Sequence, residues 1–414
     1  MKKKIALIGN MNNNFFSIAR YLRDRSYQAD LFLIDELDHF LPDSDTYDDD
    51  YKEFTFDLIH DSYSFNNTIS KVKEQLSAYD YIIGTSKVPA VLSENKIKLN
   101  MFIPHGQDVF SYPFYEGGYK ILFKILSFIN NDKLVHKVFW RLGIKKFISL
   151  YDSFLLSKNQ TKGLKLTEVI ISNNAGHIFK SSIQKIGFKN KLLTNRLPII
   201  YTDQYSSKSF YSFQKTNKYF NILSELKNEK TMLLFHHSRH SWKNAPSKFF
   251  ENGNDLLIKG FAKFIQKNPT FKIKLVTLEY GNDFLASKKL VKELDIEDYV
   301  IWLPKMCRKE IMSIIPLADL GAVSFSMPWT SGGVLYEYLS MGIPFLQCDT
   351  DNMKNDSSIY PYISANNDEE ICGAIEGYIK NKDSFINSGE IGKKWFLKNV
   401  VQIPMEIIIN EIES

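Results

Sequence analysis

Residues 318–344 read ADLGAVSFSMPWTSGGVLYEYLSMGIP. This run is typical of a buried strand over 320–324, a loop of small residues over 330–333 and a helix over 335–341. The first amides of such a helix have no partner within it and lie at the positive end of its dipole, which favours a bound diphosphate. Glu337 follows about one turn later, where its carboxylate would accept hydrogen bonds from a ribose diol. The alternative is a helix capped by Ser331, as in any α/β protein.

The same alternation of short apolar runs and amphipathic stretches extends through both halves of the chain. In the second half it predicts strands at 231–236, 272–278, 300–302, 320–324 and 344–347, with helices at 254–267, 286–294, 309–315 and 335–341. In the first half it predicts strands at 4–8, 29–34 and 81–84, with helices at 14–25 and 68–76. Strands that alternate with helices form parallel βαβ units. We therefore expect an α/β fold of two Rossmann-like, doubly wound parallel-sheet domains that face each other across a cleft.

The chain length also predicts two domains, because 414 residues exceed the roughly 250 to 300 that one core supports. We expect an N-terminal domain over 1–200 and a C-terminal domain over 226–390. Residues 201–225 lack sustained periodicity and are expected to connect the two. The last stretch, 391–414, is expected to form a helix that crosses back to the first domain.

Composition narrows the class of protein. Hydrophobic residues make up 44% and charged residues 24%, which is typical of a soluble globular chain. The net charge of +5 is too weak and too diffuse to indicate a nucleic-acid partner. The three cysteines, Cys307, Cys348 and Cys372, show no C-x-x-C spacing, which fits a reducing cytoplasm. No apolar run approaches the roughly 18 to 20 residues that cross a bilayer, so we expect a cytoplasmic protein.

One segment departs from the α/β rhythm. Residues 119–158, and Lys120 to Lys158 in particular, interleave Ile, Leu, Phe and Trp140 with lysines and Arg141. Basic amphipathic helices of this kind lie on anionic membrane surfaces, which would place the protein at the inner face of the cell membrane. The alternative is a helical pair packed on its own domain.

A second polar segment follows the predicted strand 231–236. It holds His236, His237 and His240 together with two cations, Arg239 and Lys243. Fixed cations at a strand end stabilise negative charge that develops on a leaving group, although a solvated basic turn would have the same composition. No further ligand cluster accompanies the histidines, so we expect no metal site.

These two segments carry a family resemblance. The order of a small loop, Gly332-Gly333, an apolar pair, Glu337 and the run YLSMGIP resembles the donor-binding segment of retaining GT-B glycosyltransferases, particularly glycosyltransferase family 4. The resemblance implies that Glu337 binds the donor ribose. It implies that the donor diphosphate is held by Thr330, Ser331, Gly332 and Gly333, and that Arg239 and Lys243 contact it as the family's Arg and Lys do, although one residue closer together. The family's first Glu lies eight positions before Glu337, where this chain has Trp329, so the sugar pocket at Trp329 is atypical.

The resemblance reaches the first half through His105-Gly106. Family members carry a His-Gly pair whose His approaches the donor sugar, so His105 is expected to contact the sugar and Asp108 to line the same pocket, with a buried structural histidine as the alternative. The loop from Gly9 and Asn10 lacks the G-x-G-x-x-G spacing of a dinucleotide site and is expected to help bind the donor phosphate or the acceptor. The acidic runs 43–45 and 48–50 formally contain D-x-D but lie in a polar stretch, which predicts solvated loops.

The resemblance implies transfer of a sugar from a nucleotide-diphosphate donor to a hydroxyl, with retention of configuration and with the departing phosphate as base. No metal or other cofactor is expected. Abundant Asn, Lys, Ile and Phe suggest a bacterial source, which makes a glycan or a lipid-linked acceptor in surface polysaccharide synthesis the expected partner. Two alternatives stay open: a sugar-nucleotide epimerase of the same fold, and a non-catalytic subunit that binds a glycan or a partner, which Trp329 keeps in play.

Overall fold

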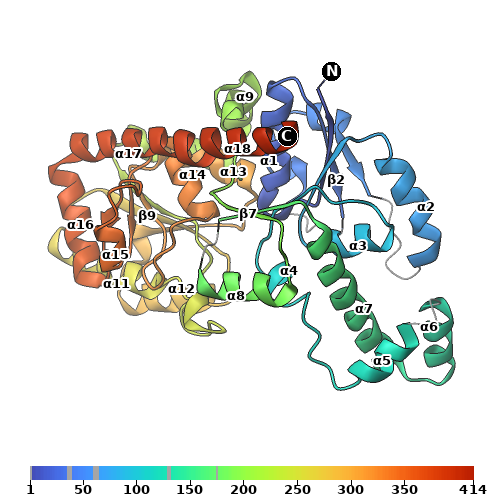
Figure 1. Ribbon diagram of the computed structural model, residues 1–414. Helices are drawn as coiled ribbons and strands as arrows, with labels where there is room; N and C mark the ends of the chain where they lie inside the picture. The colour runs from blue at the N-terminus through green and yellow to red at the C-terminus, as the bar shows by residue number, and fades with distance from the viewer. Residues whose placement is uncertain (1, 35–39, 59–64, 128–131, 174–175) are drawn as a thin grey trace. The chain divides into compact units, whose positions relative to one another are not determined.

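The computed structural model describes residues 2–34, 40–58, 65–127, 132–173 and 176–414 (Figure 1). The chain divides into two compact units. The first comprises Met1–Pro42, Asp49–Tyr201 and Ile403–Ser414, and the second comprises Asp43–Asp48 and Thr202–Gln402. Each unit holds one sheet in which every described strand pair is parallel. The expected α/β fold with two Rossmann-like parallel sheets is confirmed.

The first unit contains a seven-stranded sheet in the order β3-β2-β1-β4-β5-β6-β7. Its strands are β1 (Lys4–Ile8), β2 (Gln28–Leu33), β3 (Thr55–Asp57), β4 (Tyr81–Gly84), β5 (Met101–Phe102), β6 (Val169–Ser172) and β7 (Lys191–Thr194). Its helices are α1 (Asn14–Asp24), α2 (Phe65–Leu76), α3 (Val88–Glu94), α4 (Gln107–Phe110), α5 (Lys120–Ser127), α6 (Asp132–Arg141), α7 (Lys145–Leu166), α8 (His177–Ile186) and α18 (Ile403–Glu413).

The second unit contains a six-stranded sheet in the order β10-β9-β8-β11-β12-β13. Its strands are β8 (Met232–His236), β9 (Ile273–Leu278), β10 (Val300–Leu303), β11 (Leu320–Ala322), β12 (Phe345–Gln347) and β13 (Ile363–Ser364). Its helices are α9 (Lys208–Thr216), α10 (Lys218–Asn228), α11 (Asn254–Lys267), α12 (Phe284–Glu293), α13 (Arg308–Ile314), α14 (Gly333–Met341), α15 (Asp351–Lys354), α16 (Asp368–Lys380) and α17 (Lys382–Phe396).

Central strands of both sheets are buried on both faces, which explains their continuous apolar sequence. In β1, Ile5 pairs with Ala29 of β2 on one side and with Tyr81 of β4 on the other. In the second unit β8 is buried along its whole length between β9 and β11. The core there joins β8 and β9 to α11 and α16 through residues such as Leu234, Phe261 and Ile371.

The strand order places one topological switch point in each unit. Successive connections run in opposite directions on the two sides of β1 in the first sheet and of β8 in the second. Ligands of open α/β sheets bind outside the carboxyl ends of the strands at such a point. In the second unit this point lies between the ends of β8 and β11, and therefore beside the segments that follow His236 and Ala322.

The boundaries between the units differ from those expected. Residues 201–225, expected as a connection, hold α9 and most of α10, and both helices belong to the second unit. Side-chain oxygens of Ser207 and Asn217 cap these helices. These two residues are local helix-start signals, but without a long apolar period after them the sequence did not predict helices here. Helical geometry continues from α17 through a π-helical turn (Leu397–Gln402) into α18, which is part of the first unit.

Helices α3 and α7 of the first unit pack at unusually close range. A Cβ built on Gly163 of α7 would lie 2.0 Å from the carbonyl oxygen of Pro89 in α3. The buried side chain of Gln160, one turn earlier, donates from Nε2 to the carbonyl oxygens of Ser86 and Asp108 and accepts at Oε1 from the amide of Ala90. This contact fixes the root of α7, whose far end carries α5 and α6 (Figure 1).

Replacement of Gly163 by Ala should therefore destabilise the first unit by about 1 to 3 kcal/mol, because backbone atoms must move to admit the methyl group. Gly373 in α16 is a matched control, since a Cβ there meets nothing within 4 Å. Gly373→Ala should stabilise its unit by roughly 0.4 to 1 kcal/mol. Urea unfolding followed by circular dichroism measures both changes, and equal effects of the two substitutions would contradict the close contact.

Candidate functional site

Helix α14 begins at Gly333, and the residue at its cap position is Gly332. The cap residue therefore has no side chain that could accept a hydrogen bond from the first-turn amides, and Ser331, the predicted cap, lies one position before it. A Cβ at Gly332 would meet no atom within 4 Å, so the space beside the cap residue is open. This is the helix terminus at which the sequence predicts a diphosphate.

The carboxylate of Glu337 is buried and held by two cationic or hydrogen-bonding groups. Oε2 lies 2.7 Å from Nε2 of His237, and Nε of Arg308 donates to Oε1 at 3.0 Å. The side chain is only 7% exposed. Burial by itself would raise the pKa of Glu337, but His237 and Arg308 outweigh it and lower the pKa well below its usual range. Glu337 is therefore ionised in this arrangement.

The hydrogen bonds around His237 assign its protons. The hydroxyl of Tyr338 donates to the carbonyl oxygen of Phe235 at 2.6 Å, so it can only accept from Nδ1 of His237, 3.0 Å away. Nε2 of His237 lies against the carboxylate of Glu337, so the ring links Tyr338 to Glu337 at the end of β8.

Arg308 is the residue that joins this network to a distant part of the sequence. It lies at the first position of α13 and its side chain is 10% exposed. Nη1 lies 3.5 Å from Oδ2 of Asp45, and Nη2 lies 3.9 Å from the position of a Cβ on Gly333. Burial opposes the charge, but Asp45 and Glu337 raise the pKa of Arg308 above its already high value. A fixed cation thus lies next to the first turn of α14.

Residues 43–48 belong to the second unit, although they interrupt the first in the sequence. Asp45 is fully buried, and the hydroxyl of Tyr47 donates to the carbonyl oxygen of Lys309 at 2.9 Å. The ring of Tyr47 packs edge-on against Phe210, 5.1 Å away. The prediction that 43–45 form a solvated loop is therefore wrong at Asp45, because an internal cation pairs with it. Asp48 to Asp50 are exposed as expected.

The predicted cations Arg239 and Lys243 lie on the loop after β8, and both side chains are exposed. The guanidinium of Arg239 lies 5.8 Å from the ring centre of Phe250, and neither cation forms an ion pair with a carboxylate of the described residues. The loop itself is firmly held. Oδ2 of Asp283 accepts the amides of Trp242, Lys243 and Asn244 at 2.8 to 3.0 Å. Burial opposes this charge, but the amides lower the pKa of Asp283.

The two remaining histidines, His236 at the end of β8 and His240 on this loop, are structural. Nδ1 of His236 donates to the carbonyl oxygen of Ala322 at 3.0 Å, and Nε2 accepts from Asn254 at 2.8 Å. Burial lowers the pKa of His236 to about 3 and that of His240 to about 4, so both rings are neutral. Across the described residues, no three His, Cys, Asp or Glu side chains converge in a way that could hold a metal ion.

In the first unit, His105 is exposed and its Nε2 lies 3.1 Å from Nδ2 of Asn14. Asp108, expected in the sugar pocket, forms hydrogen bonds within its own loop. Its buried carboxylate accepts the amides of His105, Gly106 and Ser86 at 2.8 to 3.3 Å, which fixes the turn that presents His105. Burial raises the pKa of Asp108 to about 6, against the effect of these amides.

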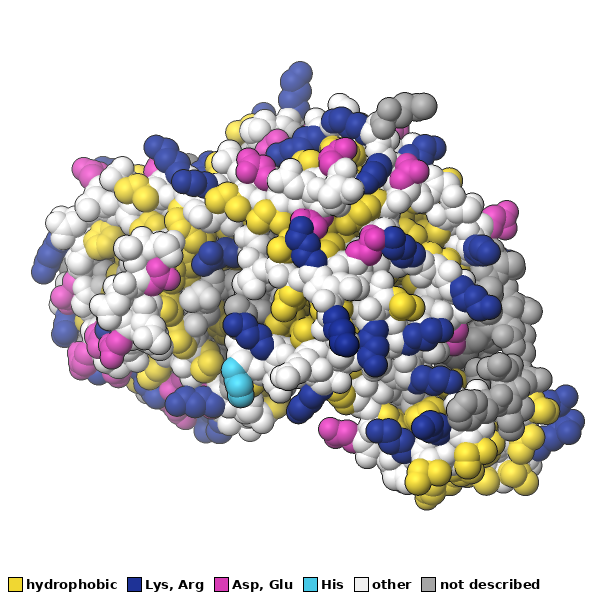
Figure 2. All heavy atoms as spheres, in the orientation of Figure 1, with side chains coloured by type: hydrophobic (Ala, Val, Ile, Leu, Met, Phe, Trp, Pro, Cys, Tyr) yellow, Lys and Arg dark blue, Asp and Glu magenta, His cyan; other side chains and the backbone are white. Residues whose placement is uncertain are grey.

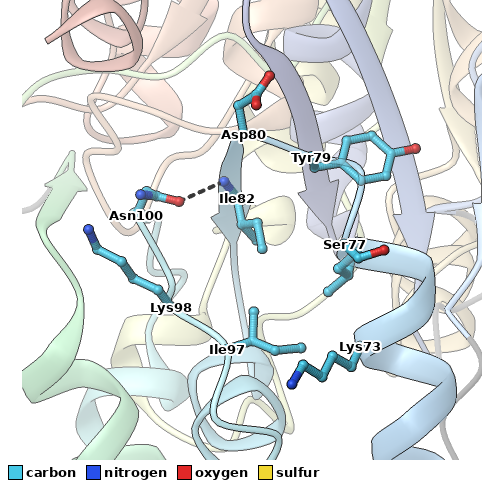
Figure 3. A pocket seen from close by; sticks show the side chains of 9 residues that line it. Lys73, Ser77, Tyr79, Asp80, Ile82, Ile97, Lys98 and Asn100 are labelled. Atoms are coloured by element: carbon cyan, nitrogen blue, oxygen red, sulfur yellow. Dashed lines mark hydrogen bonds between the residues drawn. The ribbon is translucent and has the colours of Figure 1, made fainter.

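Asn10 is likewise turned inward. It is fully buried, donates from Nδ2 to Asn13 and to the carbonyl oxygen of Phe40, and accepts the amide of Phe16 at 2.9 Å. Its side-chain amide is therefore committed to the loop. Gly9 has a φ of 91° and starts this loop at the end of β1. A separate hollow of about 380 Å³ lies at the amino ends of β4 and β5, and Lys73 and Lys98 are among the residues that line it (Figure 3).

The sequence predicted Glu337 as a site residue but did not indicate the groups that hold its carboxylate. Arg308 is the first residue of a helix that follows a strand. This placement at the carboxyl edge of the sheet was the one sequence feature that could have indicated Arg308 as a site residue. His237 was read only as a possible metal ligand. Asp45 gave no signal, because nothing in its local sequence indicates the partner 263 positions away.

No family model and no curated protein sequence matches this chain. Solved structures share its fold. HepE from Anabaena, in complex with UDP and glucose, superposes with a TM-score of 0.57 at 14% identity over 100% of both chains. A glycosyltransferase from Rickettsia africae gives 0.58 at 12% identity over 100% of this chain and 98% of that chain. UDP-GlcNAc 2-epimerase from Neisseria meningitidis, bound to UDP-GlcNAc, gives 0.53 at 10% identity over 100% of both. The chain therefore has the GT-B fold.

Replacement of Arg308 by Met should destabilise the second unit by about 3 to 5 kcal/mol, because it leaves Glu337 and Asp45 as buried charges without their shared cation. Arg239→Met is the matched control and should change stability by less than about 0.5 kcal/mol, since that side chain is exposed. Guanidinium unfolding of both variants measures the difference. A loss below about 1 kcal/mol for Arg308→Met would contradict the buried network.

The lowered pKa of Glu337 also predicts a pH dependence. Its folded-state pKa of about 2 lies below the unfolded value of about 4.3, so its stabilisation is complete above the unfolded value and is lost as the pH falls from there through the folded-state pKa. Unfolding midpoints at pH 7, 5 and 3.5 should therefore converge between the wild type and Glu337→Gln as the pH falls. Glu229→Gln, at an exposed site, should leave the wild-type profile unchanged. A constant offset between wild type and Glu337→Gln at all three pH values would contradict the assignment.

Proposed function

We propose that this protein transfers a sugar from a nucleotide-diphosphate donor to a hydroxyl acceptor. The observation that carries the proposal is the open amino terminus of α14 with Arg308 beside it, at the switch point of the second sheet. Unpaired amides, a helix dipole and a fixed cation together suit a diphosphate. Structures of the same fold hold UDP and UDP-GlcNAc, which supports a nucleotide sugar as the donor.

The catalytic requirement is stabilisation of the leaving diphosphate. Cleavage of the anomeric C–O bond leaves the electron pair on the diphosphate, and positive groups already in place lower that barrier most. Arg308 is held by Glu337 and Asp45 and cannot turn away, whereas Arg239 and Lys243 are exposed on a loop fixed by Asp283. We propose that Arg308 is already in position beside the diphosphate site before the donor binds. The side chains of Arg239 and Lys243 then turn toward the diphosphate when it binds.

The finer features follow the family resemblance. The reaction retains the anomeric configuration, with the departing phosphate as base, and needs no metal. His105 contacts the sugar, Glu337 uses its remaining lone pairs for the ribose, and Trp329 shapes an atypical sugar pocket. The acceptor is a glycan or a lipid-linked sugar of bacterial surface polysaccharide.

An epimerase is the second candidate, because UDP-GlcNAc 2-epimerase shares the fold. Epimerisation needs carboxylates that are free to move protons. Glu337 and Asp283, at the edge of the second sheet, and Asp108 in the first unit are each committed to internal partners. This favours transfer over epimerisation.

Incubation of each nucleotide sugar with and without glycan acceptors separates the two activities. A transferase releases more nucleoside diphosphate when the acceptor is present, whereas an epimerase changes the sugar and releases none.

Donor binding is tested with Gly333→Glu. A carboxylate in the first turn suits the helix dipole and leaves the fold intact, but it occupies and repels the diphosphate position. The affinity for the nucleoside diphosphate that binds best among UDP, ADP, GDP, CDP and TDP should fall at least about tenfold, a change of about 1.4 kcal/mol. Gly373→Glu, at an exposed position of α16, is the matched control and should bind as the wild type does. Calorimetry measures both; absence of saturable binding in the wild type, or equal binding by the two variants, would overturn the proposed donor site.

A further inference from the structure

Large hydrophobic side chains are exposed in one short stretch of the first unit. Of the twenty such residues exposed in the described part of the chain, nine lie between residues 119 and 144. We call this set the insert face: Tyr119, Ile121, Leu122, Ile125, Leu134, Val138, Trp140, Leu142 and Ile144. Ile121 is 78% exposed, Trp140 64% and Leu142 63%. Scattered exposed hydrophobics are ordinary, but a contiguous group marks an interaction surface.

The exposed side chains of the insert face do not result from poor packing of the helices that carry them. Helices α5, α6 and α7 enclose their own cluster, in which Phe123, Val135 and Tyr151 are buried. Nε2 of His136 on α6 lies 2.7 Å from Oδ1 of Asp152 on α7, which fastens the two helices together. The alternative expected from the sequence, a helical pair packed on its own domain, therefore accounts for the inner faces. The outer faces remain exposed, and Figure 2 shows hydrophobic side chains gathered over α5 and α6.

Positive charge is concentrated on the same stretch. Residues 119–146 contain seven lysines or arginines and one aspartate, a net charge of +6, whereas the whole chain carries +5. The remainder of the protein is therefore slightly acidic. Lys120, Lys124, Lys137, Arg141, Lys145 and Lys146 form no ion pair with any carboxylate that the structure describes, and residues 128–131 and the side chain of Lys133 lie outside the described set. Nζ of Lys145 lies 5.1 Å from the ring centre of Trp140.

We propose that the insert face binds the surface of an anionic lipid bilayer. The aliphatic side chains of Ile121, Ile125 and Leu142 enter the boundary between head groups and acyl chains, and Trp140 lies at head-group depth. The lysines reach lipid phosphates from the same helices. If two copies of the chain met through this face, two stretches with a net charge of +6 each would repel each other, so self-association through the insert face is disfavoured. No helix within the described ranges has both the length and the apolar character to cross a bilayer.

This inference does not depend on the proposed donor site. The insert face would hold the protein at the plane in which a lipid-linked acceptor resides, whichever nucleotide sugar is used. Lipid binding is measured without any nucleotide, so failure of one proposal leaves the other standing.

The test is flotation of the full-length protein with vesicles of equal parts phosphatidylglycerol and phosphatidylcholine, with phosphatidylcholine vesicles as the reference. We expect binding to the anionic vesicles that weakens as salt is raised. Lys145→Gln/Lys146→Gln should weaken it by about 30-fold, from roughly a fivefold loss for each basic residue. Ile121→Glu/Ile125→Glu should abolish it, because the helix would carry two carboxylates toward anionic lipid.

Helix α8 supplies matched controls in the same unit. Ile178 is 67% exposed, and Lys180 and Lys185 are exposed as well. Ile178→Glu and Lys180→Gln/Lys185→Gln should leave vesicle binding within about twofold of wild type, and thermal melts check that every variant is folded. Absence of binding to anionic vesicles at low salt, or equal losses in the α8 controls, overturns the proposal. So does dimerisation in ultracentrifugation that Ile121→Glu/Ile125→Glu removes, which would reassign the insert face to a second copy.

Discussion

Arg308 carries a permanent positive charge into the interior of the second unit, where Glu337 and Asp45 neutralise it. Removing an ion from water is costly, and the cost is offset only when the partners are close and well oriented. That requirement draws together three parts of the chain that are far apart in the sequence: the start of α13, Glu337 of α14 and residues 43–48. His237, at the end of the β8 segment, contacts the other oxygen of the Glu337 carboxylate. The edge of the second sheet is therefore built around one buried cation.

This arrangement has a consequence for function. A side chain that is already paired on both sides keeps its position when a ligand arrives, so its charge costs no reorganisation. Glu337, which the family resemblance assigns to the ribose, is also the residue that holds Arg308 in place. The two proposed roles of Glu337 are compatible because a carboxylate has lone pairs beyond those that His237 and Arg308 use. Loss of Glu337 would therefore affect both halves of a bound nucleotide.

The insert of α5 and α6 differs from the rest of the first unit in how its hydrophobic side chains are distributed between core and surface. Its inner faces satisfy the ordinary demand for a packed core, whereas its outer faces keep hydrophobic and basic side chains in solvent. Such a surface has no stabilising role within the unit. Gly163 and Gln160 anchor the base of α7 tightly, so the insert is presented on a fixed support.

The sequence by itself determined the fold class, because period-2 and period-3.6 apolar patterns are local properties. Strands β1 and β4 and helix α11 lie where the pattern places them, and Glu337 and the start of α14 were identified from a short segment. Short strands such as β5 and β13, with two residues each, carry too little pattern to be seen. Only the tertiary structure decided the strand order, the capture of residues 43–48 by the second unit, the pairing of Asp45 with Arg308 and the inward turn of Asn10 and Asp108. Each of these depends on contacts between residues far apart in the chain, and such contacts leave no periodic trace in a single sequence.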